Sequence, residues 1–165
     1  MRAIRFIRPC LWFDDQAEEA ARYYVSIFPN SRITQISRYT EAGFEVHKRP
    51  TGSVMTVTFE LDGHKLMGLN GGPVFKFNEA VSFEVGCDTQ EEIDHYWERL
   101  SAGGDPAAQV CGWLKDKYGL SWQVTPVKME ELMADSTSPK AQRVMTAMLK
   151  MKKLDLRELE RAAAG

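Results

Sequence analysis

The sequence predicts an α+β fold in which a strand-helix-three-strand (βαβββ) unit occurs twice in tandem, with helices following at the C-terminal end. Three observations support this prediction: a helical motif that occurs twice, a strand-like run before each copy, and a hairpin signal after each copy. The copies are DQAEEAARYY, which starts at Asp15, and DTQEEIDHYW, which starts at Asp88. Both read D-x-x-E-E-x-x-x-Y-aromatic, so we expect two structurally equivalent helices.

The two helices also share their apolar stripes, with the spacing of four and then three residues that marks one helical face. The corresponding residues are Ala20, Tyr24 and Ile27 in the first helix and Ile93, Trp97 and Leu100 in the second. A side chain at each helix start is expected to satisfy the first free N–H groups. The predicted capping boxes are Asp15 with Glu18, Asp88 with Glu91, and Asp155 with Glu158.

Strand-like runs complete the two units. One precedes each helix, at residues 4–13 and 80–87, and one follows each helix, at residues 32–39 and, more weakly, 107–110. Two hairpins come next. SVMTVTFEL and HKLMGLN flank Asp62-Gly63, and CGWLKDK and LSWQVTP flank Tyr118-Gly119, both read as two-residue turns.

The repeat sets the expected domain organisation. The first unit covers about residues 1–72 and the second about 78–127, within a paired domain of residues 1–134. Residues 135–165 form a helical extension that begins with Ser138 as cap and Pro139 in the first turn. Its apolar stripe contains Val144, Met148 and Met151, which suggests packing against the domain or across a dimer, with a lid as the alternative.

Composition excludes several classes of function. The net charge of -2 argues against nucleic acid, because phosphate binding normally requires a basic surface. No apolar run is long enough to predict a membrane span or a signal peptide. Cys10, Cys87 and Cys111 lie in apolar runs without a C-x-x-C pair, which indicates buried free thiols in a reducing compartment. We therefore expect a cytoplasmic protein.

Six phrases in order resemble the PhnB-like branch of the vicinal oxygen chelate superfamily, the superfamily of glyoxalase I, extradiol dioxygenases and bleomycin-resistance proteins. They are LWFDDQAEEAARYY, SIFPNSRI, GSVMTVTFEL, LNGGPVFKFNEAVSF, CGWLKDKYGLSWQVTP and KAQRVMTAMLKMKKLD. Members of this branch often carry the label 3-demethylubiquinone-9 3-methyltransferase domain. The resemblance implies two curved sheets whose concave faces enclose a small-molecule cavity, usually in a homodimer.

The residues give no support to methyl transfer. A typical methyl-donor site needs a strand, a glycine-rich turn and a helix N-terminus. Here Gly71-Gly72 is followed by a proline and then by another strand. We therefore predict no cofactor.

The resemblance also identifies where a metal ion would be held. Metal-using members supply one ligand from the first and fourth strands of each unit, and counting from the helix and hairpin motifs places these positions at Pro9, Met67, Ser82 and Gln123. None of these is a histidine or carboxylate, the usual ligands of zinc, iron or manganese. The sequence therefore predicts a metal-free cavity.

The hairpin turns predict which side chains face that cavity, because a shift by one residue exchanges the two faces of a strand. Turning at Asp62-Gly63 puts Thr58 and Met67 inward, and turning at Tyr118-Gly119 puts Leu114, Asp116, Ser121 and Gln123 inward. The connector FKFNEAVSF adds aromatic and polar groups, among which Glu79 is either a cavity acid or a rim charge. The predicted ligand-binding residues are Trp12, Thr58, Met67, Asn70, Phe75, Phe77, Ser82, Leu114 and Gln123.

The function predicted from the sequence is the binding of a small organic molecule in this cavity. One alternative is a metal-dependent lyase, isomerase or dioxygenase of the glyoxalase type, and another is the methyltransferase of the family label. The identity of the ligand, and whether any reaction follows binding, stay open at this stage.

Overall fold

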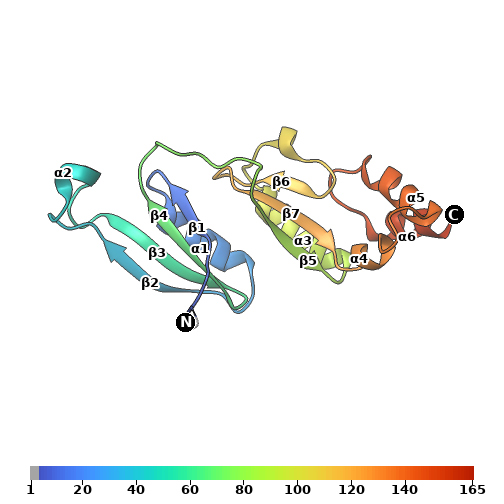
Figure 1. The fold of residues 1–165 in the computed structure, drawn as a ribbon, viewed down its shortest axis with the longest axis horizontal. Helices are drawn as coiled ribbons and strands as arrows, with labels where there is room; N and C mark the ends of the chain where they lie inside the picture. The colour runs from blue at the N-terminus through green and yellow to red at the C-terminus, as the bar shows by residue number, and fades with distance from the viewer. Residues whose placement is uncertain (1–3) are drawn as a thin grey trace. The chain divides into compact units, whose positions relative to one another are not determined.

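The computed structural model describes residues 4–165 and divides the chain after Lys76 into two compact units (Figure 1). The first unit ends at Lys76 and the second extends from Phe77 to Gly165. Each unit contains one sheet with a helix packed on one of its faces. The α+β class and the tandem repeat predicted from the sequence are therefore confirmed. None of the helices in the described part of the chain is long and apolar enough to cross a membrane.

The first unit has a four-stranded sheet in the order β1-β4-β3-β2, in which β1 is parallel to β4 and the other pairs are antiparallel. Its elements are β1 Cys10–Phe13, α1 Ala17–Ile27, β2 Arg32–Arg38, α2 Phe44–His47, β3 Val54–Leu61 and β4 His64–Asn70. The first strand begins only at Cys10, where the paired residues of β1 and β4 start, and before it only the Pro9 carbonyl bonds to β4. The predicted strand over residues 4–13 was therefore too long.

The turn between β3 and β4 forms as predicted. Asp62 and Gly63 both have positive φ, 43° and 84°, which is the backbone of a two-residue hairpin turn. The resulting register pairs Phe59 with Leu66 and Thr58 with Met67. Phe59 and Leu66 are buried under α1, whereas Thr58 and Met67 lie on the face that α1 leaves uncovered.

The second unit has a three-stranded sheet in the order β5-β7-β6, in which β5 is parallel to β7 and β6 is antiparallel to it. Its elements are β5 Ser82–Cys87, α3 Gln90–Ser101, a 3-10 helix Pro106–Ala108, β6 Trp113–Lys115, β7 Ser121–Pro126, α4 Met129–Leu132, α5 Pro139–Met148 and α6 Leu156–Ala164. The predicted stripe of Ile93, Trp97 and Leu100 on α3 is buried against this sheet, as is the matching stripe on α1 against its own.

The strand predicted over residues 107–110 is wrong. Residues 106–108 form the 3-10 helix, and only Val110 makes a bridge, to Trp113. Cys111 and Gly112 between them have positive φ, 51° and 84°, so the chain turns back at once into β6. The main-chain N–H groups of this turn donate to Met151 and Lys152, which fastens the C-terminal segment to it.

The register predicted for the second hairpin is also wrong, by one residue. The structure pairs Leu114 with Trp122 and Lys115 with Ser121, because the loop runs from Asp116 to Leu120 instead of turning at two residues. Gly119, with φ of 85°, provides the left-handed position of this longer loop. The shift moves Leu114 and Asp116 to the face covered by α3.

The helix starts differ partly from the predicted caps. The box of α3 is formed by Thr89 and Glu92, one residue after the predicted pair, and the N-cap Gln16 of α1 makes no side-chain cap hydrogen bond. The predicted N-caps of the two C-terminal helices, α5 and α6, are confirmed. Ser138 accepts a hydrogen bond from Ala141 N–H, and Asp155 accepts one from Glu158 N–H.

The C-terminal helices have a small core of their own. Leu132, Val144, Leu154 and Leu159 are buried together, and Met148 and Met151 pack against them. The predicted apolar stripe of the tail therefore has a packing role.

Candidate functional site

The uncovered face of the first sheet combines aromatic, aliphatic and hydroxyl side chains. Trp12 lies opposite Leu69 across the β1/β4 pair, and Met67 lies opposite Thr58 across the β3/β4 pair. All four are half-buried. The structure therefore brings together Trp12, Thr58 and Met67, three of the predicted site residues, on one face.

Trp12 is fixed by its surroundings. Its indole Nε1 donates to the carbonyl oxygen of Gly72 at 2.8 Å, and its ring meets Phe75 edge-on with centroids 4.9 Å apart. A Cβ atom at Gly71 would lie 2.1 Å from the indole, so only glycine allows this close approach. Phe75 is 62% exposed. The pair thus presents a preorganised aromatic surface of the kind that planar ligands stack on.

Two further residues on this side of the sheet were not among the predicted site residues. Arg8 Nη2 donates to Met67 Sδ at 3.3 Å, which places a cation next to the thioether. Cys10 shares the face of Met67 and is exposed, so the prediction of a buried thiol there is wrong. Partial desolvation raises the pKa of the Cys10 thiol, and the nearby Arg8 opposes this effect only in part. The thiol is therefore protonated near neutral pH.

Asn70 lies on the other face, under α1. Its Oδ1 accepts from the N–H of Ala17 at 2.8 Å, and its Nδ2 donates to Val54 O at 3.0 Å. The side chain is 5% exposed. Asn70 therefore caps α1 from a distant part of the chain and is not available to a ligand on the uncovered face.

The uncovered face of the second sheet is mainly polar. Its residues form rows across the three strands, from β5 through β7 to β6. The rows are Ser82, Ser121 and Lys115, then Glu84, Gln123 and Trp113, and finally Gly86 with Thr125. Ser82 and Gln123, both predicted site residues, thus share one face, whereas Leu114 is buried on the opposite face with Trp122.

Several side chains on this face are linked to one another. Gln123 Nε2 donates to Ser82 Oγ at 2.9 Å, and Thr125 Oγ1 donates to a carboxylate oxygen of Glu84 at 2.7 Å. Glu84 and Trp113 were not among the predicted site residues. The alternation of β5 around Ser82 indicated Glu84, and only the corrected register of β6 indicates Trp113.

The connector contributes an ion pair. Lys115 Nζ contacts a carboxylate oxygen of Glu79, whose side chain is 66% exposed. The hydrogen bond from Lys115 lowers the pKa of Glu79, so this carboxyl group is ionised at neutral pH. Glu79 is thus a paired, exposed acid. Phe77, also in the connector, is half-buried.

A catalytic metal ion does not fit the four positions that correspond to ligands in metal-using relatives. Pro9 offers only its carbonyl oxygen, which already accepts from the main-chain N–H of Met67, and Met67 is a thioether. Ser82 and Gln123 are neutral and hydrogen-bonded to each other. Within residues 4–165, no three histidine, cysteine, aspartate or glutamate side chains gather closely enough to hold a metal ion.

A histidine and a buried cysteine elsewhere in the chain have structural surroundings. His47 packs on Tyr39 with ring centroids 4.5 Å apart and accepts from Arg49 N–H. Cys87 is fully buried, and this burial raises its thiol pKa to about 12, so it is not a nucleophile at neutral pH.

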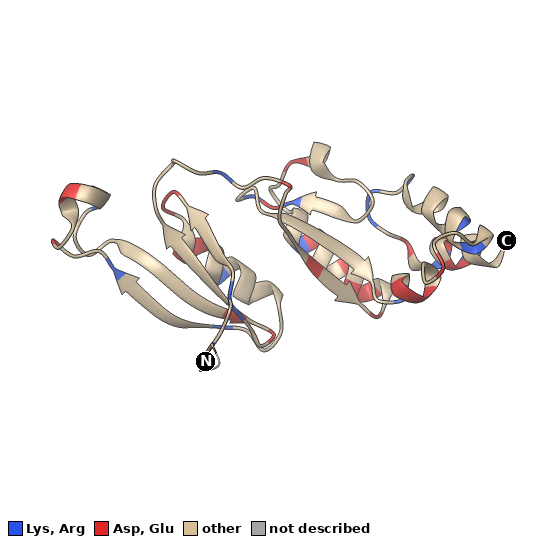
Figure 2. Cartoon of the chain, in the orientation of Figure 1, with Lys and Arg blue, Asp and Glu red and all other residues tan. Residues whose placement is uncertain are grey.

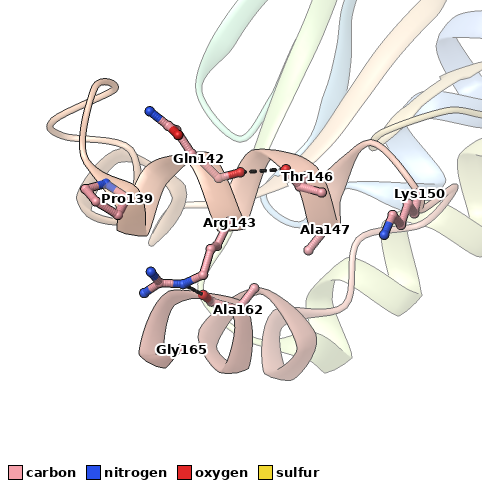
Figure 3. Close-up of a pocket in the computed structure, with 8 residues that line it drawn as sticks. All are labelled: Pro139, Gln142, Arg143, Thr146, Ala147, Lys150, Ala162 and Gly165. Atoms are coloured by element: carbon pink, nitrogen blue, oxygen red, sulfur yellow. Dashed lines mark hydrogen bonds between the residues drawn. The ribbon is translucent and has the colours of Figure 1, made fainter.

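A separate groove of about 560 Å³ lies between α5 and α6 (Figure 3). Arg143 extends from α5 to α6, where its Nε donates to Ala162 O and its Nη2 to Ala163 O, both at 2.8 Å. A cation at these last carbonyl groups stabilises the C-terminus of a helix. The arginine therefore has a structural partner, and none of the residues that line the groove comes from a strand.

Comparison with known proteins agrees with this architecture. Residues 5–125 match the family of 3-demethylubiquinone-9 3-methyltransferase. A PhnB protein from Bacillus cereus, described as a candidate 3-demethylubiquinone-9 3-methyltransferase, is 38% identical, with a TM-score of 0.62. The similarity covers 73% of this chain and 98% of that one. No curated protein matches the chain significantly.

More distant solved structures share the fold alone. Protein PA1353 from Pseudomonas aeruginosa is 19% identical over 73% of this chain and 96% of that chain, with a TM-score of 0.54. The fosfomycin resistance protein FosX from Listeria monocytogenes is 17% identical over 76% and 93%, with a TM-score of 0.51.

The family match and the Bacillus cereus relative identify a member of the vicinal oxygen chelate superfamily. Within that superfamily, the chain belongs to the PhnB-like family described as 3-demethylubiquinone-9 3-methyltransferase.

Proposed function

We propose that this protein binds small organic molecules without a metal ion, and that the uncovered face of each sheet is a candidate site within its own unit. The observation that supports this proposal most directly is the contrast between the two faces of each sheet. One face is filled by a helix and buried, whereas the other presents half-buried aromatic and hydrogen-bonding groups. Such a mixture is typical of small-molecule sites, where apolar surface provides affinity and a few polar groups provide orientation.

The candidate site of the first unit would bind by stacking, and that of the second unit by hydrogen bonding. Trp12 is held in one position, so binding would not have to order its ring. Gln123 uses one amide hydrogen on Ser82, which leaves its Oε1 and its second amide hydrogen to a ligand. The site on the second sheet includes Glu84 and Trp113 and omits Leu114, which lies under α3.

Methyl transfer, the activity in the family description, has less support from the residues. Asn70 already accepts from the first N–H group of α1, and Thr89 and Glu92 form a capping box at the start of α3, so a cofactor phosphate or carboxylate would compete with these caps. A glyoxalase-type reaction is disfavoured by the donor set at the metal positions. Homodimerisation, which the family resemblance implies, and a cytoplasmic location, which the composition suggests, belong to the same proposal, and light scattering would measure the former.

A thermal-shift screen of metabolites against chelator-treated protein tests the binding function. A ligand that binds only the folded chain raises the melting temperature, by mass action. We expect at least one organic hit whose shift is unchanged by added zinc, nickel, manganese or iron. Trp12→Ala or Gln123→Ala should reduce that shift, whereas Phe44→Ala, which removes an exposed ring on α2, should not.

Metal analysis of protein purified without chelators completes the test. We expect far less than one equivalent of any transition metal. Stoichiometric metal, or ligand binding that appears only after metal is added, would contradict the proposal. Saturable binding of S-adenosylmethionine at micromolar concentration would favour the methyltransferase instead.

A further inference from the structure

Ser121 in β7 has a buried hydroxyl group that lacks a hydrogen-bond partner. The residue is 1% exposed, and its Oγ is the one buried side-chain oxygen or nitrogen without a partner that the structure records in residues 4–165. Leaving a buried polar group unpaired is unfavourable, so such groups are rare and require an explanation. If the side chain of Ser121 only filled space, alanine could replace it without loss of stability.

The neighbours of Ser121 suggest what this hydroxyl group is for. Ser121 is the middle of a row on the uncovered face, with Ser82 on one side and Lys115 on the other. Neighbouring strands are about 4.8 Å apart, so the three side chains project from adjacent points. Ser82 Oγ already accepts from Gln123, which leaves its own proton to donate. The row therefore offers two hydroxyl donors and one ammonium group.

Lys115 gives the row its charge. The strands of this sheet contain only two charged side chains, Lys115 in β6 and Glu84 in β5 (Figure 2). Lys115 is held by Glu79, a carboxylate from the connector that precedes β5. Lys115 is 25% exposed and Glu79 is 66% exposed, and ion pairs this close to solvent contribute little to stability. A second carboxylate can therefore displace Glu79.

We propose that Ser82, Ser121 and Lys115 form a subsite for the carboxylate group of the bound molecule. In the absence of this molecule Glu79 pairs with Lys115, and the carboxylate of the ligand displaces Glu79 when it binds. The inference rests on the proposed small-molecule function and adds the chemical class of the ligand. A carboxylate is favoured over a phosphate because the row has one cation and no helix N-terminus, whereas phosphate sites usually combine several charges or N–H groups. The contact with Glu79 itself shows that a carboxylate fits the ammonium group. Trp113, in the adjacent row, provides apolar surface next to the subsite.

Titration of ¹⁵N-labelled protein with benzoate, benzamide and inorganic phosphate tests this subsite. Benzamide has the shape of benzoate without its charge. We expect benzoate to shift the amide signals of Ser82, Ser121 and Lys115 in a saturable way, with little effect from benzamide or phosphate. Lys115→Met should weaken benzoate binding about tenfold, as expected for the loss of a charge-assisted hydrogen bond. Lys65→Met is the matched control, because Lys65 is an exposed lysine on the first sheet, near Glu60.

Two further variants separate binding from structural roles. Glu79→Gln removes the competing carboxylate and should tighten benzoate binding several-fold, an effect that a merely structural ion pair would not produce. Ser121→Ala should weaken benzoate binding while raising the melting temperature, because the unpaired hydroxyl group is lost. The ¹⁵N spectrum of each variant verifies that it is folded.

Four results would overturn the subsite: no saturable shifts with benzoate, equal shifts with benzamide, a stronger response to phosphate than to benzoate, or unchanged affinity in Glu79→Gln. The proposed function has a separate test. A neutral metabolite that raises the melting temperature of wild-type protein and of Lys115→Met equally would refute the carboxylate subsite and leave small-molecule binding intact. A screen without organic hits would refute the binding function itself.

Discussion

Asn70 joins three segments of the first unit through one residue. Its side chain accepts from Ala17 N–H and donates to Val54 O, and its main-chain oxygen accepts from the hydroxyl of Tyr39 at 2.6 Å. A residue at the end of β4 thereby caps a helix that begins 53 positions earlier in the chain. The cap of α1 is thus a tertiary contact, which explains why Asp15 and Glu18 do not form one.

Asn70→Ala should therefore destabilise the first unit. Both side-chain hydrogen bonds are lost, and Ala17 N–H is left unpaired at a buried site, so we expect a loss of about 2 kcal/mol. Urea unfolding followed by circular dichroism measures the change. Asn70→Asp retains the acceptor for Ala17 and should lose less. A change below about 0.5 kcal/mol for the alanine variant, the range of ordinary surface substitutions, would show that Asn70 does not cap the helix.

At the scale of elements, the two hairpins show how similar sequence signals produce different turns. Asp62-Gly63 forms a two-residue turn in which both residues have positive φ, whereas only Gly119 does so in the second hairpin. In the second, Asp116 accepts from the N–H groups of Tyr118 and Leu120 through Oδ1, and from the indole of Trp122 through Oδ2. The carboxylate thus fixes a longer loop and the register of the strands that follow.

Asp116→Ala should be strongly destabilising. Asp116 is 2% exposed and accepts three hydrogen bonds, so its removal leaves several buried donors unpaired, and we expect a loss of about 3 kcal/mol. Chemical denaturation measures this loss. Asp62→Asn is the matched control, because asparagine is equally suited to positive φ, and should change stability by less than about 0.5 kcal/mol. Equal effects in the two hairpins would show that the Asp116 contacts do not hold the loop.

The elements that were predicted correctly are those determined by local pattern. The apolar stripes of α1 and α3, the Asp62-Gly63 turn and the tail caps follow from spacing within a short stretch of chain. The capping box of α3 was misplaced by one residue within such a local pattern, whereas the two larger errors concern choices made by tertiary contacts. The Asp116 side chain selects the second register, and the Cys111-Gly112 turn, fastened to the C-terminal segment, replaces the predicted strand.

At the scale of the whole molecule, the same limits apply to the candidate site. Trp12, Thr58 and Met67 share a face because the first hairpin is a local signal, and Ser82 and Gln123 share a face because β5 and β7 pair in parallel. Leu114 was misplaced and Trp113 missed, since both depend on the register of β6. The lack of a hydrogen-bond partner for Ser121 Oγ could not be predicted, because it depends on which partners all the neighbouring polar groups bind in the folded protein.

The second sheet also allows a direct test of the proposal that the protein binds no metal ion because its side chains, and not its backbone, differ from those of metal enzymes. Ser82 and Gln123 already contact each other, and Glu84 lies beside Gln123 in the same row. If the geometry is retained and only the donor groups have changed, Ser82→His combined with Gln123→Glu should create a three-ligand site with Glu84. Histidine and carboxylate oxygen are ordinary zinc ligands, and three protein ligands are typical of an open zinc site.

We expect the double variant to bind one equivalent of zinc in calorimetry and to gain thermal stability when zinc is added, because a metal that binds only the folded chain stabilises it. Wild-type protein should show neither effect, and Ser82→His alone should bind zinc much more weakly, since it lacks the second introduced ligand. Replacing Glu84 with glutamine in the double variant should reduce the affinity again. Saturable zinc binding by the wild type would contradict the metal-free proposal. A double variant that folds but does not bind zinc would instead show that this face differs in backbone geometry, and not only in side chains, from that of the metal-using relatives.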